Sequence, residues 1–211
     1  MNPELLLELT APSLLVIEER PRKDIVIGVP HHAPAGQATL PCPEHSDSDE
    51  NAGFLGHYLA ESLGCASIIA CNYTIDGNKY LRSDYTMQIA RWNPKVLVEI
   101  HGHGGRRARS DIEISSGSMD GDSHSQALAD QLASILAGDE AFKDITICGE
   151  YEKIYFKASK SLTISNGRWL AYHLELPYVL RKTGKKGEKP PELGYRFCDL
   201  LAKVLVDIHG S

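Results

Sequence analysis

KVLVEIHGHGG, residues 95–105, is the stretch that decides the fold. Its apolar run lies between Pro94 and a glycine-rich exit, a pattern typical of a buried strand in a mostly parallel sheet. His101 and His103 stand where this strand should end, and open α/β sheets bind their ligands at the carboxyl ends of strands. The stretch therefore predicts an α/β fold with a ligand site at this point. The alternative is a strand-end histidine that only bonds a neighbouring loop.

A second stretch, IVIGVPHHAPAG at residues 25–36, has the same form. Its apolar run is followed by His31 and His32, and a proline-containing loop then continues to about residue 48. Long loops without secondary structure in compact domains tend to be functional or disordered. Two strands that end in histidine indicate a shared site.

The acidic pair Asp49 and Glu50 follows this loop, where a helix is expected to begin. Two imidazoles and one carboxylate leave a fourth coordination position open for water, which is the arrangement of a catalytic zinc site. The predicted zinc ligands are His31, His101 and either Asp49 or Glu50, a choice that the sequence leaves open. His45, His57, His124 and His209 are interpreted as surface or helix-face residues.

Two further acidic residues lie inside apolar strands. Glu175, in LAYHLEL at residues 170–176, shares one face of its strand with His173 and is the predicted general base. Glu99 either holds a ligand histidine from behind or pairs with an arginine. A carboxylate in an apolar strand needs a partner or a function.

Composition limits the classes of protein. The 211 residues are 42% hydrophobic and 24% charged, which predicts one domain over 1–211 with a well-buried core. The net charge of −6 argues against a nucleic-acid partner, and no apolar run is long enough to cross a membrane. Five scattered cysteines without a CxxC pair favour a reducing compartment, so a cytoplasmic location is expected.

Strand and helix patterns alternate along the chain, which predicts an α/β sandwich. Strands are expected at 14–18, 24–29, 66–71, 96–100, 111–114 and 170–176, with weaker candidates at 145–148 and 162–165. Helices are expected from residue 48 or 49 to 63 and at 83–92, 123–136 and 192–209.

The motifs VPHHAPAG, DSDENAGFL, IDGNK, VLVEIHGHGG and HLELPYVLR, in this order, resemble the N-formylglutamate amidohydrolase family. The wider clan includes zinc carboxypeptidases and aspartoacylase, and the resemblance spans roughly residues 25–181. It implies a three-layer α/β/α sandwich with a mixed, mostly parallel central sheet and one Zn²⁺ ion.

Position by position, the resemblance assigns His31, Asp49 (or its neighbour Glu50) and His101 as zinc ligands, and Glu175 as the catalytic carboxylate. Asp76, Asn78 and Lys79 match the turn that would hold the acidic end of the substrate. Lys79 departs from the family's arginine, which exchanges a bidentate clamp for a point charge. Ala52 stands for threonine, and Gly102-His103 replaces the usual hydroxyl residue. The substrate is therefore left open.

Basic residues lie near the predicted site. Arg106 and Arg107 follow the glycines directly, and Arg181 follows the Glu175 strand. Cations concentrated there on an acidic protein would attract a small anionic substrate. The alternative is that these arginines are solvated and pair with surface acids.

The sequence as a whole predicts a zinc-dependent amidohydrolase that cleaves an N-acyl, for example N-formyl, amino acid or a related small amide. The alternatives are a carboxypeptidase-like peptidase and a non-catalytic metal- or anion-binding protein on the same scaffold. The sequence leaves open the acyl group, the metal loaded in cells, the roles of His32 and His103, and whether the chain forms a homo-oligomer.

Overall fold

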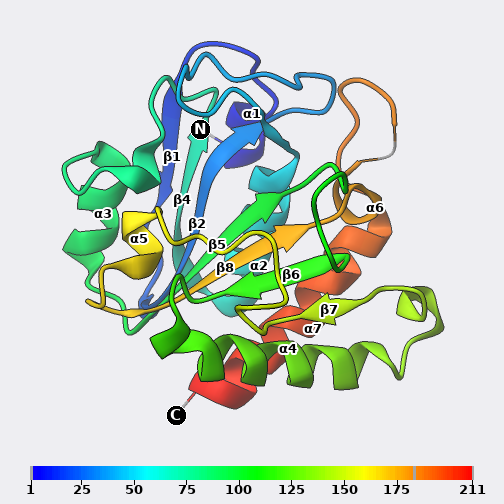
Figure 1. Cartoon of the computed structure of the whole chain (residues 1–211). Helices are drawn as coiled ribbons and strands as arrows, with labels where there is room; N and C mark the ends of the chain where they lie inside the picture. The colour runs from blue at the N-terminus through cyan, green and yellow to red at the C-terminus, as the bar shows by residue number, and fades with distance from the viewer. Residues whose placement is uncertain (1, 183, 211) are drawn as a thin grey trace.

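The computed structural model describes residues 2–182 and 184–210. The domain predicted over 1–211 also includes Met1, Thr183 and Ser211, which lie outside the described residues. In the described part, one mixed sheet runs through the molecule with helices on both faces (Figure 1). This arrangement confirms the predicted three-layer α/β/α fold.

The strands of this sheet are β1 (Leu14–Glu18), β2 (Arg22–Ala33), β3 (Asp49–Glu50), β4 (Cys65–Cys71), β5 (Val96–Gly102), β6 (Ile112–Ser115), β7 (Ile147–Cys148) and β8 (Leu170–Leu176). Their order is β1-β4-β2-β5-β8-β6-β7, and β3 pairs with the end of β2. The four central strands, β4, β2, β5 and β8, are parallel, whereas β1 and β6 join them antiparallel. The sheet is therefore mixed and mostly parallel, as predicted.

Helices cover the two faces of the sheet and bury separate apolar cores. On one face lie α2 (Ala52–Leu63), α4 (Asp122–Leu136) and α7 (Glu192–His209), and on the other lie α3 (Asp84–Trp92) and the single turn α5 (Leu162–Ser165). The short helices α1 (Pro3–Leu7) and α6 (Tyr178–Arg181) and the 3₁₀ turns η1 (Gly77–Lys79), η2 (Met119–Gly121) and η3 (Glu140–Phe142) complete the chain. Both cores are built from alternate residues of the same strands.

This alternation also places the polar residues of the two central strands. Leu97 on β5 and Ala171 on β8 belong to the core under α3 and α5. Glu99 and His101 on β5 and His173 and Glu175 on β8 continue those two rows on the same face, because side chains two residues apart share a face. The strands' carboxyl ends therefore present a polar patch directly above an apolar core.

Three local predictions were wrong. Residues 162–165 form a helical turn instead of a strand, because the Asn166 side-chain amide bonds the Leu162 and Thr163 carbonyls and closes the turn. The second strand runs past Pro30 to Ala33, and its last two residues pair with Asp49 and Glu50. Helix α2 consequently begins only at Ala52, after the left-handed residue Asn51.

Within the described residues, no helix combines the length and apolarity that crossing a membrane requires.

Candidate metal centre

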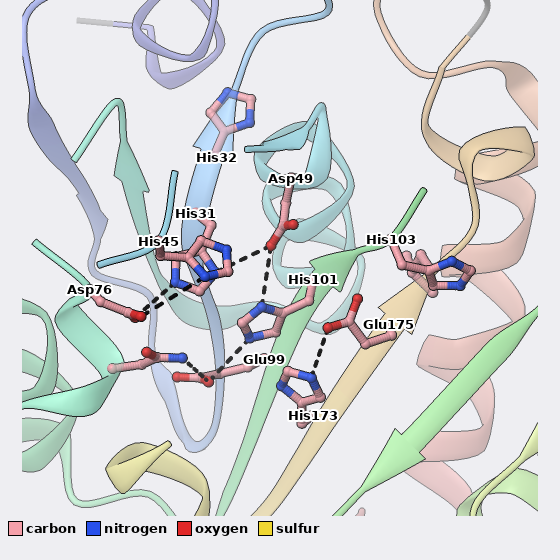
Figure 2. A network of polar contacts seen from close by, with 12 residues as sticks. His31, His32, His45, Asp49, Asp76, Glu99, His101, His103, His173 and Glu175 are labelled. Atoms are coloured by element: carbon pink, nitrogen blue, oxygen red, sulfur yellow. Dashed lines mark hydrogen bonds and ion pairs between the residues drawn. The ribbon is translucent and has the colours of Figure 1, made fainter. Parts of the chain in front are cut away.

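Three side chains from separate parts of the chain point at one another above the sheet (Figure 2). Nδ1 of His31 is 3.4 Å from Oδ2 of Asp49, and Nδ1 of His101 is 3.2 Å from the same oxygen. The donor atoms of the three residues all lie within 4.8 Å of one another, and all three residues are buried. Such a cluster has the ligand types, the number and the proximity that a divalent cation such as Zn²⁺ requires.

Two of these donor atoms lack a hydrogen-bond partner. Nδ1 of His31 and Oδ2 of Asp49 are buried and make no hydrogen bond with a described residue. Buried polar atoms are normally bonded, so an unbonded pair needs an explanation such as a bound ion. The two unbonded donor atoms therefore show that these residues fit a metal ion.

Carboxylates behind the two histidines set their tautomers. Nε2 of His31 donates to Oδ1 of Asp76 at 3.0 Å, and Nε2 of His101 donates to Oε2 of Glu99 at 3.4 Å. With the proton on Nε2, each Nδ1 keeps its lone pair for the cluster. Such outer carboxylates orient ligand histidines and raise their basicity.

Glu99 and Asp76 are themselves held in place. Glu99 is fully buried, accepts a hydrogen bond from the Tyr85 hydroxyl at 3.0 Å and contacts the Asn78 amide at 3.5 Å. Asp76 also binds the Lys79 ammonium. The choice left open for Glu99 is thereby settled as a histidine partner instead of an arginine partner.

Electrostatics indicate that the cluster requires positive charge. Burial opposes protonation of His101, but the neighbouring carboxylates of Asp49 and Glu99 outweigh burial and raise the pKa of His101 to about 10. Burial likewise opposes ionisation of Asp49, yet His101 and His31 hold the pKa of that carboxyl far below its usual range. A proton or a metal ion would balance the negative charge of these carboxylates.

The structure distinguishes the two acidic candidates. Glu50 accepts a hydrogen bond from the backbone N–H of Gly36 at 2.6 Å and binds the Lys182 ammonium. Its carboxylate is thus used in joining two loops, whereas the Asp49 oxygen faces both histidines. Between the two, Asp49 is the residue placed to hold a metal ion.

Glu175 lies next to this cluster. It stands opposite His101 in the β5–β8 register, and its Oε1 accepts a hydrogen bond from Nε2 of His173 at 3.1 Å. The His173 ring lies 4.0 Å from the His101 ring, centroid to centroid. Burial would raise the pKa of Glu175, but His173 and His101 outweigh it and lower that pKa, so the carboxyl is ionised at neutral pH.

The second oxygen of Glu175, Oε2, is buried without a hydrogen-bond partner among the described residues. An ionised carboxylate with one oxygen anchored and the other free can accept a proton from a neighbouring molecule. His173 was not predicted as a site residue, although its place on the same strand face as Glu175 was the available signal.

A cavity of about 500 Å³ opens beside these residues. Its walls include the cluster residues Asp49 and His101, the carboxylate Glu175, the arginines Arg106, Arg107 and Arg181, and the aromatic residues Tyr155, Phe156 and Tyr178. The cavity thus joins a cation-binding cluster, a proton acceptor and a basic wall.

The three arginines differ in how they are held. Arg181 is buried and donates to the carbonyls of Leu176, Glu50 and His103. Its guanidinium lies over Gly102, where a Cβ would come within 2.0 Å of Cζ, so only glycine fits there. Arg107 is exposed and bonds the Tyr155 hydroxyl at 2.9 Å. Arg106 makes no hydrogen bond or ion pair with any described residue, so its guanidinium is free to bind a ligand.

The turn Asp76–Lys79 does not lie on the cavity wall. Asp76 is fully buried and bonds His31, and Asn78 is buried beside Glu99. In the structure Asp76 is the outer partner of His31 and Asn78 contacts Glu99, the outer partner of His101. The substrate-binding role of this turn stays a prediction. Lys79 serves Asp76.

The two remaining histidines of the motifs have structural roles. His32 accepts the Gly53 N–H on Nδ1 and bonds the Leu7 carbonyl through Nε2, and burial lowers its pKa to about 4. His103 accepts the Gly105 N–H and donates to the Asp111 carbonyl. Each uses both ring nitrogens on backbone groups.

Of the four histidines interpreted as surface or helix-face residues, His45 is half-buried in a loop beside the cluster, and His57 lies on a helix face that is buried. The His45 ring stacks on His31 at 3.8 Å between centroids, at the edge of the cluster, and burial lowers its pKa to about 4. His57 is buried and donates to Glu18 at 2.6 Å. His45 lies in a loop without periodicity, so no sequence signal placed it here.

Comparisons with known proteins identify the fold. No family model matches the sequence, and no curated protein matches it. Among solved structures, a bacteriophage poly-gamma-glutamate hydrolase is 11% identical with a TM-score of 0.58, over 98% of this chain and 95% of that one. The N-formylglutamate amidohydrolase from Ralstonia eutropha JMP134 is 13% identical with a TM-score of 0.55, over 94% and 97% of the two chains.

A metallo-carboxypeptidase from Burkholderia cenocepacia is 14% identical with a TM-score of 0.50, over 99% of this chain and 68% of that one. The chain therefore shares its fold with these proteins, and the fold expected from the motif resemblance is confirmed.

Proposed function

We propose that this protein is a zinc-dependent amidohydrolase that cleaves a small anionic N-acyl amino acid or a related amide. The observation that carries the proposal is the convergence of His31, Asp49 and His101 beside the free oxygen of Glu175, at one end of a cavity. The shared fold with an N-formylglutamate amidohydrolase and a metallo-carboxypeptidase supports the same class of chemistry.

His31 and His101, through Nδ1, and Asp49, through Oδ2, would hold the ion. Bound there, Zn²⁺ would polarise the amide carbonyl and make a water molecule more acidic. Asp76 and Glu99 keep both imidazoles in the tautomer that this binding needs.

Glu175 acts as the general base and then as the general acid. Its Oε2 takes a proton from the attacking water and delivers it to the leaving amine. His173 holds Oε1 at 3.1 Å and so fixes the orientation of the carboxylate. Because burial would otherwise favour the neutral acid, the charged neighbours that lower the pKa of Glu175 keep it ready to accept a proton.

The basic wall selects the substrate. Arg106 and Arg107 bind the carboxylate of an amino acid whose amide bond lies at the metal cluster, and Arg181 adds positive potential from behind. The acyl group itself is the part that a substrate panel must identify.

Two variants test this assignment. We expect His101→Ala to lose zinc, because one of three ligands is removed, and Glu175→Gln to keep zinc but lose turnover by about 10²-fold or more. Zinc content by elemental analysis and hydrolysis of N-formyl, N-acetyl and N-succinyl amino acids and short peptides are the measurements.

The same panel separates the alternatives. Hydrolysis of peptides alone would indicate a carboxypeptidase-like peptidase. Zinc binding without hydrolysis of any amide would indicate a metal- or anion-binding protein. Undiminished turnover in both variants would refute the proposed site.

A further inference from the structure

Glu113 on β6 carries a carboxylate that lies inside the protein. It is fully buried and makes no ion pair with any described residue. Its Oε1 accepts the backbone N–H of Arg109 at 2.7 Å, and its Oε2 accepts those of Tyr155 and Phe156, both at 2.8 Å. A buried carboxylate is costly unless it is fully bonded, so three converging N–H groups indicate a specific role.

The three amides belong to two separate loops that form one wall of the cavity. Gly104–Arg107 lines the cavity from one loop, and Tyr155 and Phe156 line it from the other. The loops also contact each other, since Arg107 bonds the Tyr155 hydroxyl and the Phe156 ring stacks on His103. Glu113 is the side chain that binds both loops from beneath.

Glu113 also connects this wall to the proposed catalytic residue. β6 pairs antiparallel with β8, and Glu113 is the direct register partner of Glu175. Directly opposed residues have side chains on the same face of a sheet. The loop that carries Arg106 and Arg107 is thus held at a set position relative to Glu175.

We infer that Glu113 is a positioning residue that aligns the arginine-bearing wall for recognition of the substrate's carboxylate. This inference rests on the proposed function of the site. Both oxygens are needed, because glutamine would turn an NH₂ group toward at least one backbone N–H and release that loop. Release of either loop lets the cationic wall move away from the position that an anion needs.

The test uses zinc-loaded protein in a Glu175→Gln background, which prevents turnover, and two probes: N-acetyl-L-glutamate and its uncharged diamide. We expect Glu113→Gln to raise the Kd of N-acetyl-L-glutamate about tenfold and to leave that of the diamide unchanged. Amide hydrogen exchange at Arg109, Tyr155 or Phe156 should accelerate. In otherwise wild-type protein, KM should rise with little change in kcat.

Asp122→Asn is the matched control. Asp122 accepts the backbone N–H of Tyr151 at 2.7 Å, so it anchors the same stretch of chain without touching the cavity. Asp122→Asn should leave the Kd values of both probes unchanged. If Glu113→Gln does not fold, Glu113→Asp is the substitute, because it keeps both carboxylate oxygens on a side chain that is one methylene shorter. We expect it to reduce the preference for N-acetyl-L-glutamate over the diamide by a smaller factor.

Faster amide exchange with an unchanged Kd for N-acetyl-L-glutamate would overturn the inference. An equal rise in the Kd values of both probes would also overturn it, as would failure of the protein with Glu113 intact to bind either probe. A selective rise in Kd without hydrolysis of any amide by the wild type would support the inference and contradict the proposed function.

Discussion

At the residue scale, the surroundings of each carboxylate divide the roles within the site. Among the described residues, six acidic side chains lie buried near the cavity: Asp49, Glu50, Asp76, Glu99, Glu113 and Glu175. Asp76 and Glu99 stand behind the histidines, and Asp49 faces both imidazoles. Glu175 pairs with His173, Glu50 joins two loops through Lys182, and Glu113 holds two loops through backbone N–H groups. The same functional group can therefore hold a metal, orient a ligand or accept a proton, according to which oxygen is left free.

The division between Asp49 and Glu50 leads to a prediction. Asp49→Asn should weaken zinc binding by more than about 100-fold, because it removes the charge that faces both imidazoles. Glu50→Gln should leave zinc affinity unchanged, since its carboxylate is occupied by Gly36 and Lys182. Competition titration against a chromophoric chelator measures both. The reverse pattern would assign the ligand to Glu50.

At the element scale, a second polar cluster ties the edge strand β1 to β4 and α2. Glu18 on β1 accepts hydrogen bonds from Arg20 at 2.9 Å, from the Ser67 hydroxyl at 3.1 Å and from His57 at 2.6 Å. Its side chain is 14% exposed, so solvent screens these bonds only in part. The cluster explains why His57, in the middle of an amphipathic helix, is buried.

This cluster should make stability depend on pH. Burial raises the pKa of Glu18, but His57 and Arg20 outweigh it, so the folded-state pKa lies below the usual 4.5. A depressed carboxyl pKa contributes stability above the unfolded-state value, and this contribution is lost as pH falls below 4.5 through the folded-state pKa. Glu18→Gln should cost on the order of 1 kcal/mol at pH 7 and reduce the fall in stability at acid pH.

Urea unfolding at a series of pH values measures this effect. Glu61→Gln, on the exposed side of α2, is the matched control and should change neither the stability nor its acid dependence. An equal acid dependence in wild type and Glu18→Gln would contradict the role assigned to the cluster.

At the scale of the whole molecule, the cluster of candidate metal ligands forms only when the sheet is complete. His31 comes from β2, Asp49 from β3 and His101 from β5, and these strands are neighbours in space but not in sequence. An unfolded chain offers the same residues without their geometry, so the ion should bind the folded state preferentially.

Zinc should consequently raise thermal stability. At a free zinc concentration 100 times Kd the gain is about 2.7 kcal/mol. For a chain of this size that gain corresponds to a rise in Tm of roughly 5 to 10 °C. Scanning calorimetry with zinc and then with excess chelator measures it, and His101→Ala should show no rise. A Tm that zinc leaves unchanged in the wild type would contradict a metal centre at this position.

The sequence alone determined which segments form the main strands of the sheet, because apolar periodicity reports directly which residues are buried, but it ended the second strand at Pro30 instead of Ala33. It predicted His31 and His101 as strand-end residues and Glu175 as a carboxylate inside an apolar strand, all at one site, and the structure brings the three together. It misplaced 162–165, where a side-chain amide closes a turn that strand propensity does not register.

Only the tertiary structure decided how the polar groups pair. The partner of Glu50 is Lys182, 132 residues away, and the partner of His31 is Asp76, 45 residues away. The stacking of His45 on His31 and the three amides on Glu113 likewise join separate loops. Burial follows a local pattern that the sequence displays, whereas which oxygen faces which nitrogen depends on distances that exist only after the strands have come together.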